Sequence, residues 1–318
     1  FLLIFILSGM LAMFGILQQF VPWLLHQQNK FNYTSTSLFT NPNFFSGYLV
    51  IHIPIGFYLM CHGRSGIGRM GLAGLWVMVW IALGFSGSPG GQLLAIAQAL
   101  SLTAYLYIRK DLRNLKLLGW SLLIAILIYF SIIEFISGNT LVGAEALQDS
   151  LIRRPWVWEH LENRFMYWTG AWSIFKDHWL VGSGLWTFIE LYPQTGLKYT
   201  PPHAHNMYLQ TLAETGLVGF GFLMACLIIL FKTFVGIFKR GGAERKDIGF
   251  YIAISLSCFL LHNLIEYNWL TSNFIYIFVF LIISVEILNR DPKINNNIMW
   301  NAKYFGPKII PFIIIVGA

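Results

Sequence analysis

Charged residues are scarce in this chain: they make up 11% of its 318 residues, whereas hydrophobic residues make up 56%. Soluble domains carry about 25% charged residues. The scarcity of charge therefore excludes an ordinary soluble domain and indicates a membrane protein with several spans. Cysteine is scarce as well, and Cys61, Cys226 and Cys258 all lie in or beside apolar runs. We interpret them as small core residues rather than disulfide partners or metal ligands.

Several motifs of enzyme chemistry are also absent. The sequence contains no H-E-x-x-H, no G-x-S-x-G and no glycine-rich phosphate loop. These absences argue against a membrane protease, a lipase or a nucleotide-binding enzyme. Between residues 137 and 205 there is no D-x-D or comparable acidic pair, so no divalent metal site for a sugar nucleotide is visible. We expect neither a metal nor another cofactor.

Long apolar runs, in contrast, are abundant. A span needs roughly 20 residues, and suitable runs lie near 1–25, 44–61, 70–86, 91–108, 115–136, 206–231, 248–265 and 271–288. A ninth run begins near Ile309 and is cut off at Ala318, and Phe1 already lies inside a run. The sequence therefore reads as a fragment of a larger bundle. The predicted fold is an all-α polytopic membrane protein with about nine visible transmembrane helices, in residues 1–136 and 206–318, around one long loop in residues 137–205.

The distribution of Lys and Arg predicts the orientation. If alternate loops lie on opposite sides of the membrane, one side carries 15 of the 21 cations. The positive-inside rule makes that side cytoplasmic, so the loop over residues 137–205 faces outward. The net charge of +7 thus arises from loop asymmetry, and we expect no nucleic-acid partner.

Aromatic residues with helical spacing mark this outward loop. Positions 164, 168, 172, 175 and 179 lie on one helical face. The pattern predicts a short interfacial helix whose tryptophans anchor it at the depth of the lipid headgroups. Such a helix would hold Arg164, the first residue of the stripe, over the membrane.

A polar segment with two histidines leads directly into the apolar run at 206–231. Thr200-Pro201-Pro202 is expected to be extended, because residues before proline avoid the helical region, and Asn206 is a plausible N-cap of the helix that follows. His205 would lie at the positive end of that helix, which disfavours its imidazolium form and suits it to accept a proton from a hydroxyl. Free N–H groups there could also bind an anion such as a diphosphate. The simpler alternative is a histidine that only caps a helix at the membrane surface.

Further polar residues are candidates for the same outward cleft. His203 is expected to line the cleft or to bond to His205. His262 and Glu266 have i, i+4 spacing near the outer end of a later helix, so they either pair structurally or contribute to the cleft. Gly216 and Gly219 form a small-x-x-small pair that favours close helix packing.

Three segments resemble one family. They are N-P-N at 41–43, the stretch from Arg164 to Phe188 that ends in G-x-G-x-x-x-F, and H-N-x9-G-x-x-G beginning at His205. This combination is similar to the superfamily of O-antigen ligases, O-antigen polymerases and O-oligosaccharyltransferases. The resemblance implies transfer of a glycan from a polyprenyl-diphosphate carrier at the outer face of the bacterial inner membrane. It also implies that His205 is the catalytic histidine and that Arg164 is the family's loop arginine.

Arg164 is suited to hold the diphosphate leaving group, because a planar guanidinium contacts two oxygens at once. Arg153 and Arg154 are alternatives, and Asn206 is a further candidate contact for the substrate. One departure concerns the turn at Ser86–Gly91, where Pro89 stands in place of an arginine that the family often carries. Another cation, such as Arg153 or Arg154, would then have to supply that charge.

The function we expect is an inverting, metal-independent glycosyl transfer to an acceptor hydroxyl. The acceptor is a lipid A core sugar, a growing glycan or a protein, and the residues do not decide among them. The alternative from another class is a transporter or flippase of lipid-linked glycan. That class is marked by ionisable residues deep in several spans, whereas here His52 is the clearest case of one. The pattern favours an enzyme with its site at the membrane surface.

The predicted orientation can be tested by labelling. Single cysteines placed at Gln148 and Gln194 should react with a membrane-impermeant thiol reagent in intact cells that lack an outer barrier. A cysteine at Gly242 should not react, because it lies on the cytoplasmic side. Protection of the first two positions would reverse the orientation.

Overall fold

A computed structural model describes residues 1–21, 34–63, 66–139, 155–198, 200–270 and 272–290. In this part of the chain every regular element is helical. The elements are α1 (Leu2–Leu17), α3 (Pro42–His62), α4 (Ile67–Ser86), α5 (Pro89–Ile108), α6 (Leu112–Asn139), α8 (Pro155–Asp177), α9 (Phe188–Leu191), η1 (Tyr192–Thr195), α10 (Met207–Arg240), α11 (Ala243–His262), η2 (Asn268–Leu270) and α12 (Ser272–Arg290).

Each predicted apolar run among the described residues overlaps a helix, but α1 and α11 end at Leu17 and His262, before the ends of the runs near 1–25 and 248–265. Five of these helices, α3, α4, α5, α6 and α10, are long and apolar enough to cross a membrane. The helix α1 is shorter, at 16 residues. The prediction of an all-α polytopic membrane protein is therefore confirmed, while the number nine stays a prediction. The run that begins at Ile309 lies outside the described residues.

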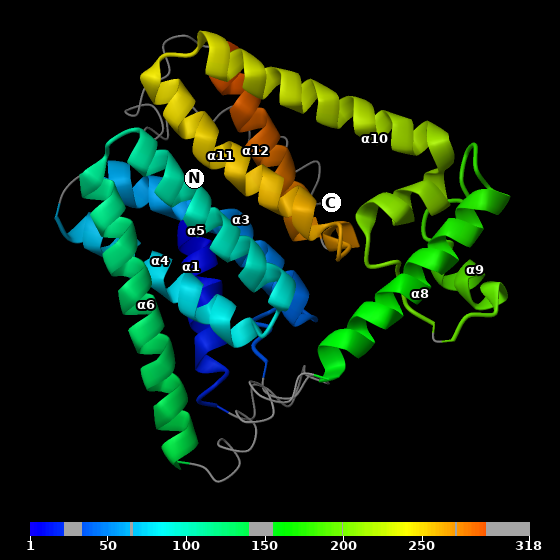
Figure 1. The fold of residues 1–318 in the computed structure, drawn as a ribbon, viewed down its shortest axis with the longest axis horizontal. Coiled ribbons are helices and arrows are strands. Elements are labelled where there is room, and N and C mark those ends of the chain that lie inside the picture. The colour runs from blue at the N-terminus through cyan, green and yellow to red at the C-terminus, as the bar shows by residue number, and fades with distance from the viewer. Residues whose placement is uncertain (22–33, 64–65, 140–154, 199, 271, 291–318) are drawn as a thin grey trace.

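Helix α3 forms the centre of the bundle and is buried along almost its whole length. It packs against α1, α4, α5 and α11 (Figure 1). Pro54 lies inside α3 and has no N–H to donate to the carbonyl oxygen of Val50. The side-chain Nε2 of Gln98 on α5 donates to that oxygen instead, at 2.9 Å. A proline inside a membrane helix is thus tolerated, because a neighbouring helix supplies the missing donor.

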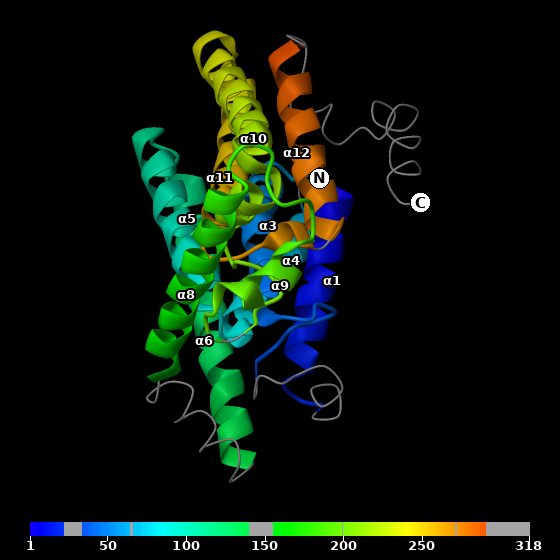
Figure 2. The same ribbon diagram turned by 90° about the vertical axis from the view of Figure 1, so that its right-hand side faces the viewer.

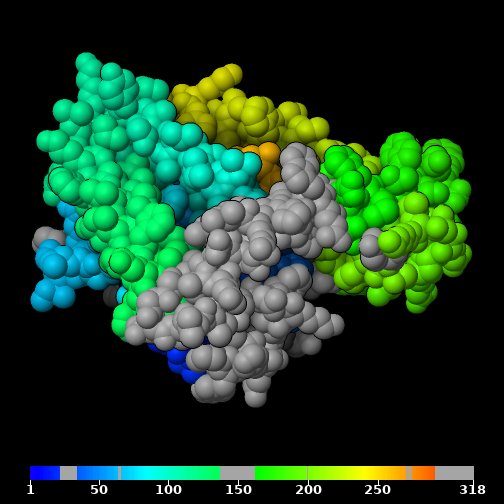
Figure 3. Space-filling model, turned by 60° about the horizontal axis from the view of Figure 1, so that its bottom comes forward, coloured from blue at the N-terminus to red at the C-terminus, as the bar shows by residue number. Residues whose placement is uncertain are grey.

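A second unit, which we call the α8 lobe, consists of α8, α9, η1 and the residues 200–215 that end in the first turns of α10. It has its own small core of Ala171, Ile174, Phe188, Tyr192, Ala204 and Ala213. Figures 1 and 2 place it at one side of the bundle, and Figure 3 shows it protruding there. The predicted helix through Arg164 is confirmed as part of α8, although α8 ends at Asp177, before the last predicted position, Trp179. Trp172 and Trp179 are exposed. Its location at the membrane interface stays a prediction.

Helix α10 is interrupted at Gly216. A straight helix of 34 residues would be about 51 Å long, well beyond the hydrocarbon thickness of roughly 30 Å. Gly216 has φ 63° and ψ −164°, which separates a short first segment from the long apolar one. A Cβ at Gly216 would lie 2.4 Å from the carbonyl carbon and oxygen of Leu180. The backbone N–H groups of Leu217 and Val218 donate to Trp179 and Leu180 at 2.9 and 3.1 Å.

These contacts give Gly216 a role other than the expected helix packing. It allows the backbone that follows α8 to lie directly against α10. The same approach requires Gly182, which has φ 77° and whose Cβ would lie 2.2 Å from the backbone of Glu214. Gly219 does not share this role, because a Cβ there would meet the side chain of Thr215.

Gly216→Ala should therefore destabilise the protein by about 1–3 kcal/mol, since alanine is strained at this φ and ψ and its Cβ overlaps Leu180. Gly221→Ala on the same helix is the matched control, because no atom lies within 4 Å of its Cβ position. It should be neutral or stabilising by up to about 1 kcal/mol. Thermal unfolding of the purified protein measures both. Equal stability of the two variants would contradict the role of Gly216.

Candidate active site

The segment before α10 holds the two histidines in a tight turn. Asn206 is the N-cap, as predicted, and its Oδ1 accepts from the N–H groups of Tyr208 and Leu209 at 3.0 Å each. The N–H of Met207 donates to the carbonyl of Asn263 at 2.9 Å. The first N–H groups of α10 are therefore occupied, and the expectation that they bind an anion is wrong. Asn206 itself serves as the helix cap.

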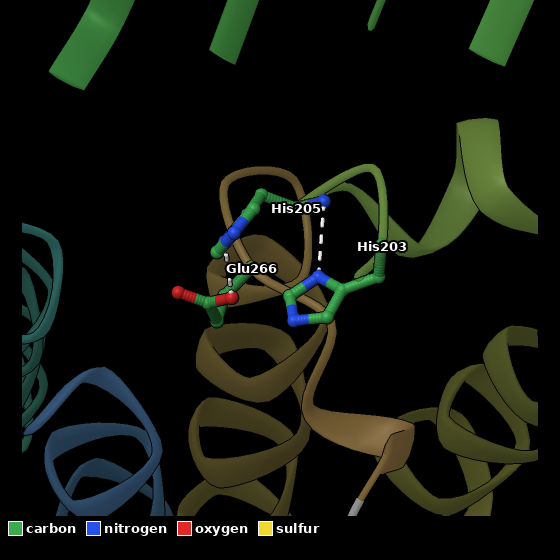
Figure 4. A group of neighbouring side chains, drawn as sticks. All are labelled: His203, His205 and Glu266. Carbon is green, nitrogen blue, oxygen red and sulfur yellow. Dashed lines mark hydrogen bonds and ion pairs between the residues drawn. The ribbon is translucent and has the colours of Figure 1, made fainter. Parts of the chain in front are cut away.

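His205 has φ 48°, a left-handed conformation that residues other than glycine rarely adopt. Backbone strain of this kind is found preferentially at functional sites. In this conformation the imidazole of His205 meets the carboxylate of Glu266 (Figure 4). A strained backbone is maintained only when the surrounding contacts require it.

Glu266 lies in the turn between α11 and η2. Helix α11 ends at His262, so the prediction that His262 and Glu266 share a helical face is wrong. The Nδ1 of His262 is instead 2.8 Å from the Nδ2 of Asn268, and its ring packs against Gly47. His262 is buried and belongs to the structural core beside the site. Glu266 is free of that pairing and turns toward the α8 lobe.

The carboxylate of Glu266 brings three other elements together. Its Oε1 is 2.7 Å from the Nδ1 of His205. Its Oε2 accepts from the Nδ2 of Asn43 at 2.9 Å and lies 3.8 Å from the Nη2 of Arg164. The side chain of Glu266 is only 1% exposed, whereas those of His205 and Arg164 are each 19% exposed. The predicted pair of Arg164 and His205 thus meets at one buried carboxylate.

The electrostatics of this cluster favour an ionised glutamate. Burial alone would raise the pKa of Glu266, but the charge and hydrogen bond of His205, together with His203 and Arg164, hold the pKa below its usual value. Burial, followed by the charge on His205, lowers the pKa of His203 to about 4. His203 is therefore neutral near pH 7, beside a carboxylate that is charged.

The hydrogen bonds also define which nitrogen of each histidine carries a proton. The backbone N–H of His205 donates to the Nδ1 of His203 at 3.2 Å. Neutral His203 must then carry its proton on Nε2. When His205 is neutral, its Nδ1–H donates to the ionised Glu266, and Nε2 is then the basic nitrogen. His205 Nε2 has no partner among the described residues.

The same three side chains are also candidate ligands for a metal ion. The potential ligand atoms of His203, His205 and Glu266 lie within 4.8 Å of one another. However, the Nδ1 lone pair of His203 already accepts a backbone N–H, and the Nδ1 of His205 acts as a donor. This arrangement favours a hydrogen-bonded network over metal coordination. The expectation of a metal-free site stays a prediction.

Sequence reasoning missed three residues that contact the cluster of His203, His205 and Glu266. Asn43 is part of N-P-N, and no local sequence pattern indicates that it bonds to Glu266. The ring of Tyr167 stacks on His205 with centroids 5.7 Å apart. The ring of Tyr267 lies 5.6 Å from that of His203, and its backbone N–H donates to Glu266.

Two expectations from the sequence have different outcomes. Arg153 and Arg154 lie outside the described residues, so their proposed contact stays a prediction. Pro89 is the first residue of α5, and the side chain of Ser88 caps this helix by accepting from the N–H of Gly91. The proline is thus explained locally as a helix start.

The fold and the cluster describe a polytopic membrane protein with a histidine–carboxylate–arginine site at the end of its helical bundle. The family model of the O-antigen ligases matches residues 47–224. The chain belongs to this O-antigen ligase family, whose membership implies glycan transfer of the ligase or polymerase type in a membrane. A comparison with curated proteins found none that matches the chain. The matched range contains Arg164 and both histidines and ends before Glu266.

The depressed pKa of Glu266 predicts a pH-dependent stability. A carboxylate with a folded pKa below its unfolded value near 4.5 stabilises the protein above that pH, and this contribution is lost as the pH falls further. Glu266→Gln should lower the melting temperature near pH 7, and the difference from wild type should shrink below about pH 4.5. Thermal unfolding of both proteins across pH checks this. A difference that grows on acidification would contradict the pairing.

Proposed function

We propose that this protein transfers a glycan from a polyprenyl-diphosphate carrier to an acceptor hydroxyl at the outer face of a bacterial inner membrane. The observation that carries the proposal is the 2.7 Å bond between His205 Nδ1 and the buried carboxylate of Glu266. It leaves His205 Nε2 available as a general base, with Arg164 beside it. Family membership supplies the reaction class.

In the proposed step, His205 Nε2 takes the proton of the acceptor hydroxyl. The oxygen attacks the anomeric carbon as the bond between that carbon and the diphosphate oxygen breaks. The diphosphate leaves with the electron pair, and the configuration at the anomeric carbon inverts. Glu266 orients the imidazole and stabilises the imidazolium that forms, as a buried carboxylate does beside other catalytic histidines.

Arg164 is proposed to stabilise the leaving diphosphate. Its guanidinium is partly exposed, and Glu266 contacts it through one nitrogen at 3.8 Å. The remaining N–H groups are then able to contact two phosphate oxygens together. Because the N-terminus of α10 has no free N–H groups to offer, this role falls on Arg164, with Arg153 and Arg154 as further candidates.

His203 and Asn206 have supporting roles in this proposal. His203 presents Nε2–H, a donor beside the base, and is suited to orient the acceptor or the leaving group. Asn206 fixes the start of α10 and therefore the position of His205. His262 bonds to Asn268 in the core beside the site. The acceptor itself, whether a lipid A core sugar, a growing glycan or a protein hydroxyl, is left open.

His205→Gln should lower the transfer rate by about 10²–10⁴-fold, because it keeps the size of the side chain but has no basic nitrogen. His203→Ala should be milder. Transfer from a polyprenyl-diphosphate donor in reconstituted vesicles measures both. His178→Gln, at the exposed end of α8, is the matched control and should behave as wild type.

Two results would overturn this assignment. If His205→Gln keeps most of the activity while His203→Ala is inactive, the base is His203. If the vesicles move lipid-linked glycan across the membrane and transfer none of it, the protein is a transporter of the same substrate.

Arg164→Lys should lose most of the activity, because a bidentate contact with the diphosphate becomes a single point charge. Arg164→Ala should be at least as poor, whereas Lys176→Ala on the exposed surface of the same helix should have no effect. The same vesicle assay reports all three. Transfer by Arg164→Ala at the wild-type rate would move the diphosphate role to Arg153 and Arg154.

A further inference from the structure

A chain of buried hydrogen bonds leads to the turn at residues 203–205, which we call the histidine turn. Ala204, between the two histidines, is fully buried, and its N–H donates to the Oε1 of Gln210 at 2.7 Å. The Nε2 of Gln210 donates to the Oε1 of Glu214 at 2.7 Å. The same carboxylate oxygen accepts from the N–H of Phe188 at 3.3 Å. Gln210 and Glu214 are themselves 2% and 4% exposed.

The far end of this chain of hydrogen bonds is fixed by backbone contacts. The N–H groups of Ser183 and Gly184 donate to the carbonyls of Ala213 and Glu214 at 3.0 Å each. Glu214 is therefore held between its own helix and the segment that leads into α9. Because Glu214 is fixed, its hydrogen bond fixes the side chain of Gln210, and Gln210 in turn fixes the peptide that precedes His205.

The histidine turn needs such a support because it is strained. His205 has φ 48°, and a buried N–H at Ala204 without an acceptor would cost about 1–3 kcal/mol. If Gln210 were lost, the turn would relax to find Ala204 another acceptor, and the direction of the imidazole would change with it. Glu214 lies nine positions after His205 in the sequence, and the hydrogen bonds of Gln210 link it to the peptide that precedes the histidine.

We propose that Gln210 and Glu214 are positioning residues that hold His205 in the geometry in which Nδ1 meets Glu266 and Nε2 meets the acceptor. This inference rests on the proposed function, because it concerns the placement of the proposed base. It assigns a mechanical role to the polar side chains on the first segment of α10. Both side chains are buried, and they act through the turn that holds the base.

The test compares two single variants, Gln210→Leu and Gln210→Glu, with a double variant that combines Gln210→Glu with Glu214→Gln. We call the double variant the exchange. Gln210→Leu removes the acceptor of Ala204, and a misplacement of about 1 Å can cost on the order of 100-fold in rate. Gln210→Glu places two carboxylates face to face. In the exchanged protein the new glutamate accepts from Ala204, and the new glutamine donates to it while accepting from Phe188. Both single variants should lose kcat by about 10–100-fold with little change in KM, and the exchange should restore kcat.

Gln98→Leu is the matched control, since Gln98 is also a buried glutamine that bonds a backbone group but lies within the bundle. It should lower the melting temperature while the folded protein keeps its kcat. If Gln210→Leu fails to fold, the kcat of the exchange compared with that of Gln210→Glu tests the positioning role. Wild-type kcat in Gln210→Leu, or no recovery in the exchange, would overturn the positioning role. Activity in His205→Gln would instead overturn the proposed base.

Discussion

The candidate site depends on the buried carboxylate of Glu266 and on the contacts that this carboxylate makes. An unpaired charge in a protein interior costs several kcal/mol, so a buried carboxylate requires partners with good geometry. Here the partners come from α3, from α8 and from the turn before α10, through Asn43, Arg164 and His205. The bundle and the α8 lobe therefore meet at one charged group. The site exists only when both units are in place, because neither unit holds the base and its carboxylate by itself.

Glycine contacts determine how the lobe approaches the bundle. Gly182 and Gly216 let two backbone segments pack without side chains between them, and the resulting hydrogen bonds fix the first segment of α10 at an angle to the long apolar one. This short segment carries Asn206, Gln210 and Glu214. The motif H-N-x9-G-x-x-G thus begins at the turn that holds the proposed base, and its first glycine is the break in α10 that orients this turn.

The sequence predicted the parts of this structure that depend on local chemistry. The apolar runs, the cap at Asn206 and the helix through Arg164 all follow from hydropathy, capping and periodicity, and the structure agrees with them. The parts that depend on tertiary contacts were missed. Asn43 and Glu266 are 223 residues apart, and local pattern does not connect them. The end of α11 at His262 was missed as well, so of the two alternatives for Glu266 the helical pairing with His262 is wrong, and Glu266 bonds to His205 instead. The break at Gly216 arises from contact with Leu180 and has no local signal beyond the glycine itself.

A second carboxylate at the opposite end of the bundle shows what distinguishes a candidate base from a structural histidine. Asp247 lies 3.2 Å from the Nε2 of His62 and 3.5 Å from the Nη1 of Arg109, and so repeats the histidine–carboxylate–arginine composition. In His62, however, Nδ1 is bonded to the carbonyl of Tyr58, so both ring nitrogens are occupied. His205 uses only Nδ1, and its Nε2 is bonded to no described residue. Composition alone would not separate the two clusters. The unoccupied nitrogen does, because a base needs a lone pair that the fold has not already used.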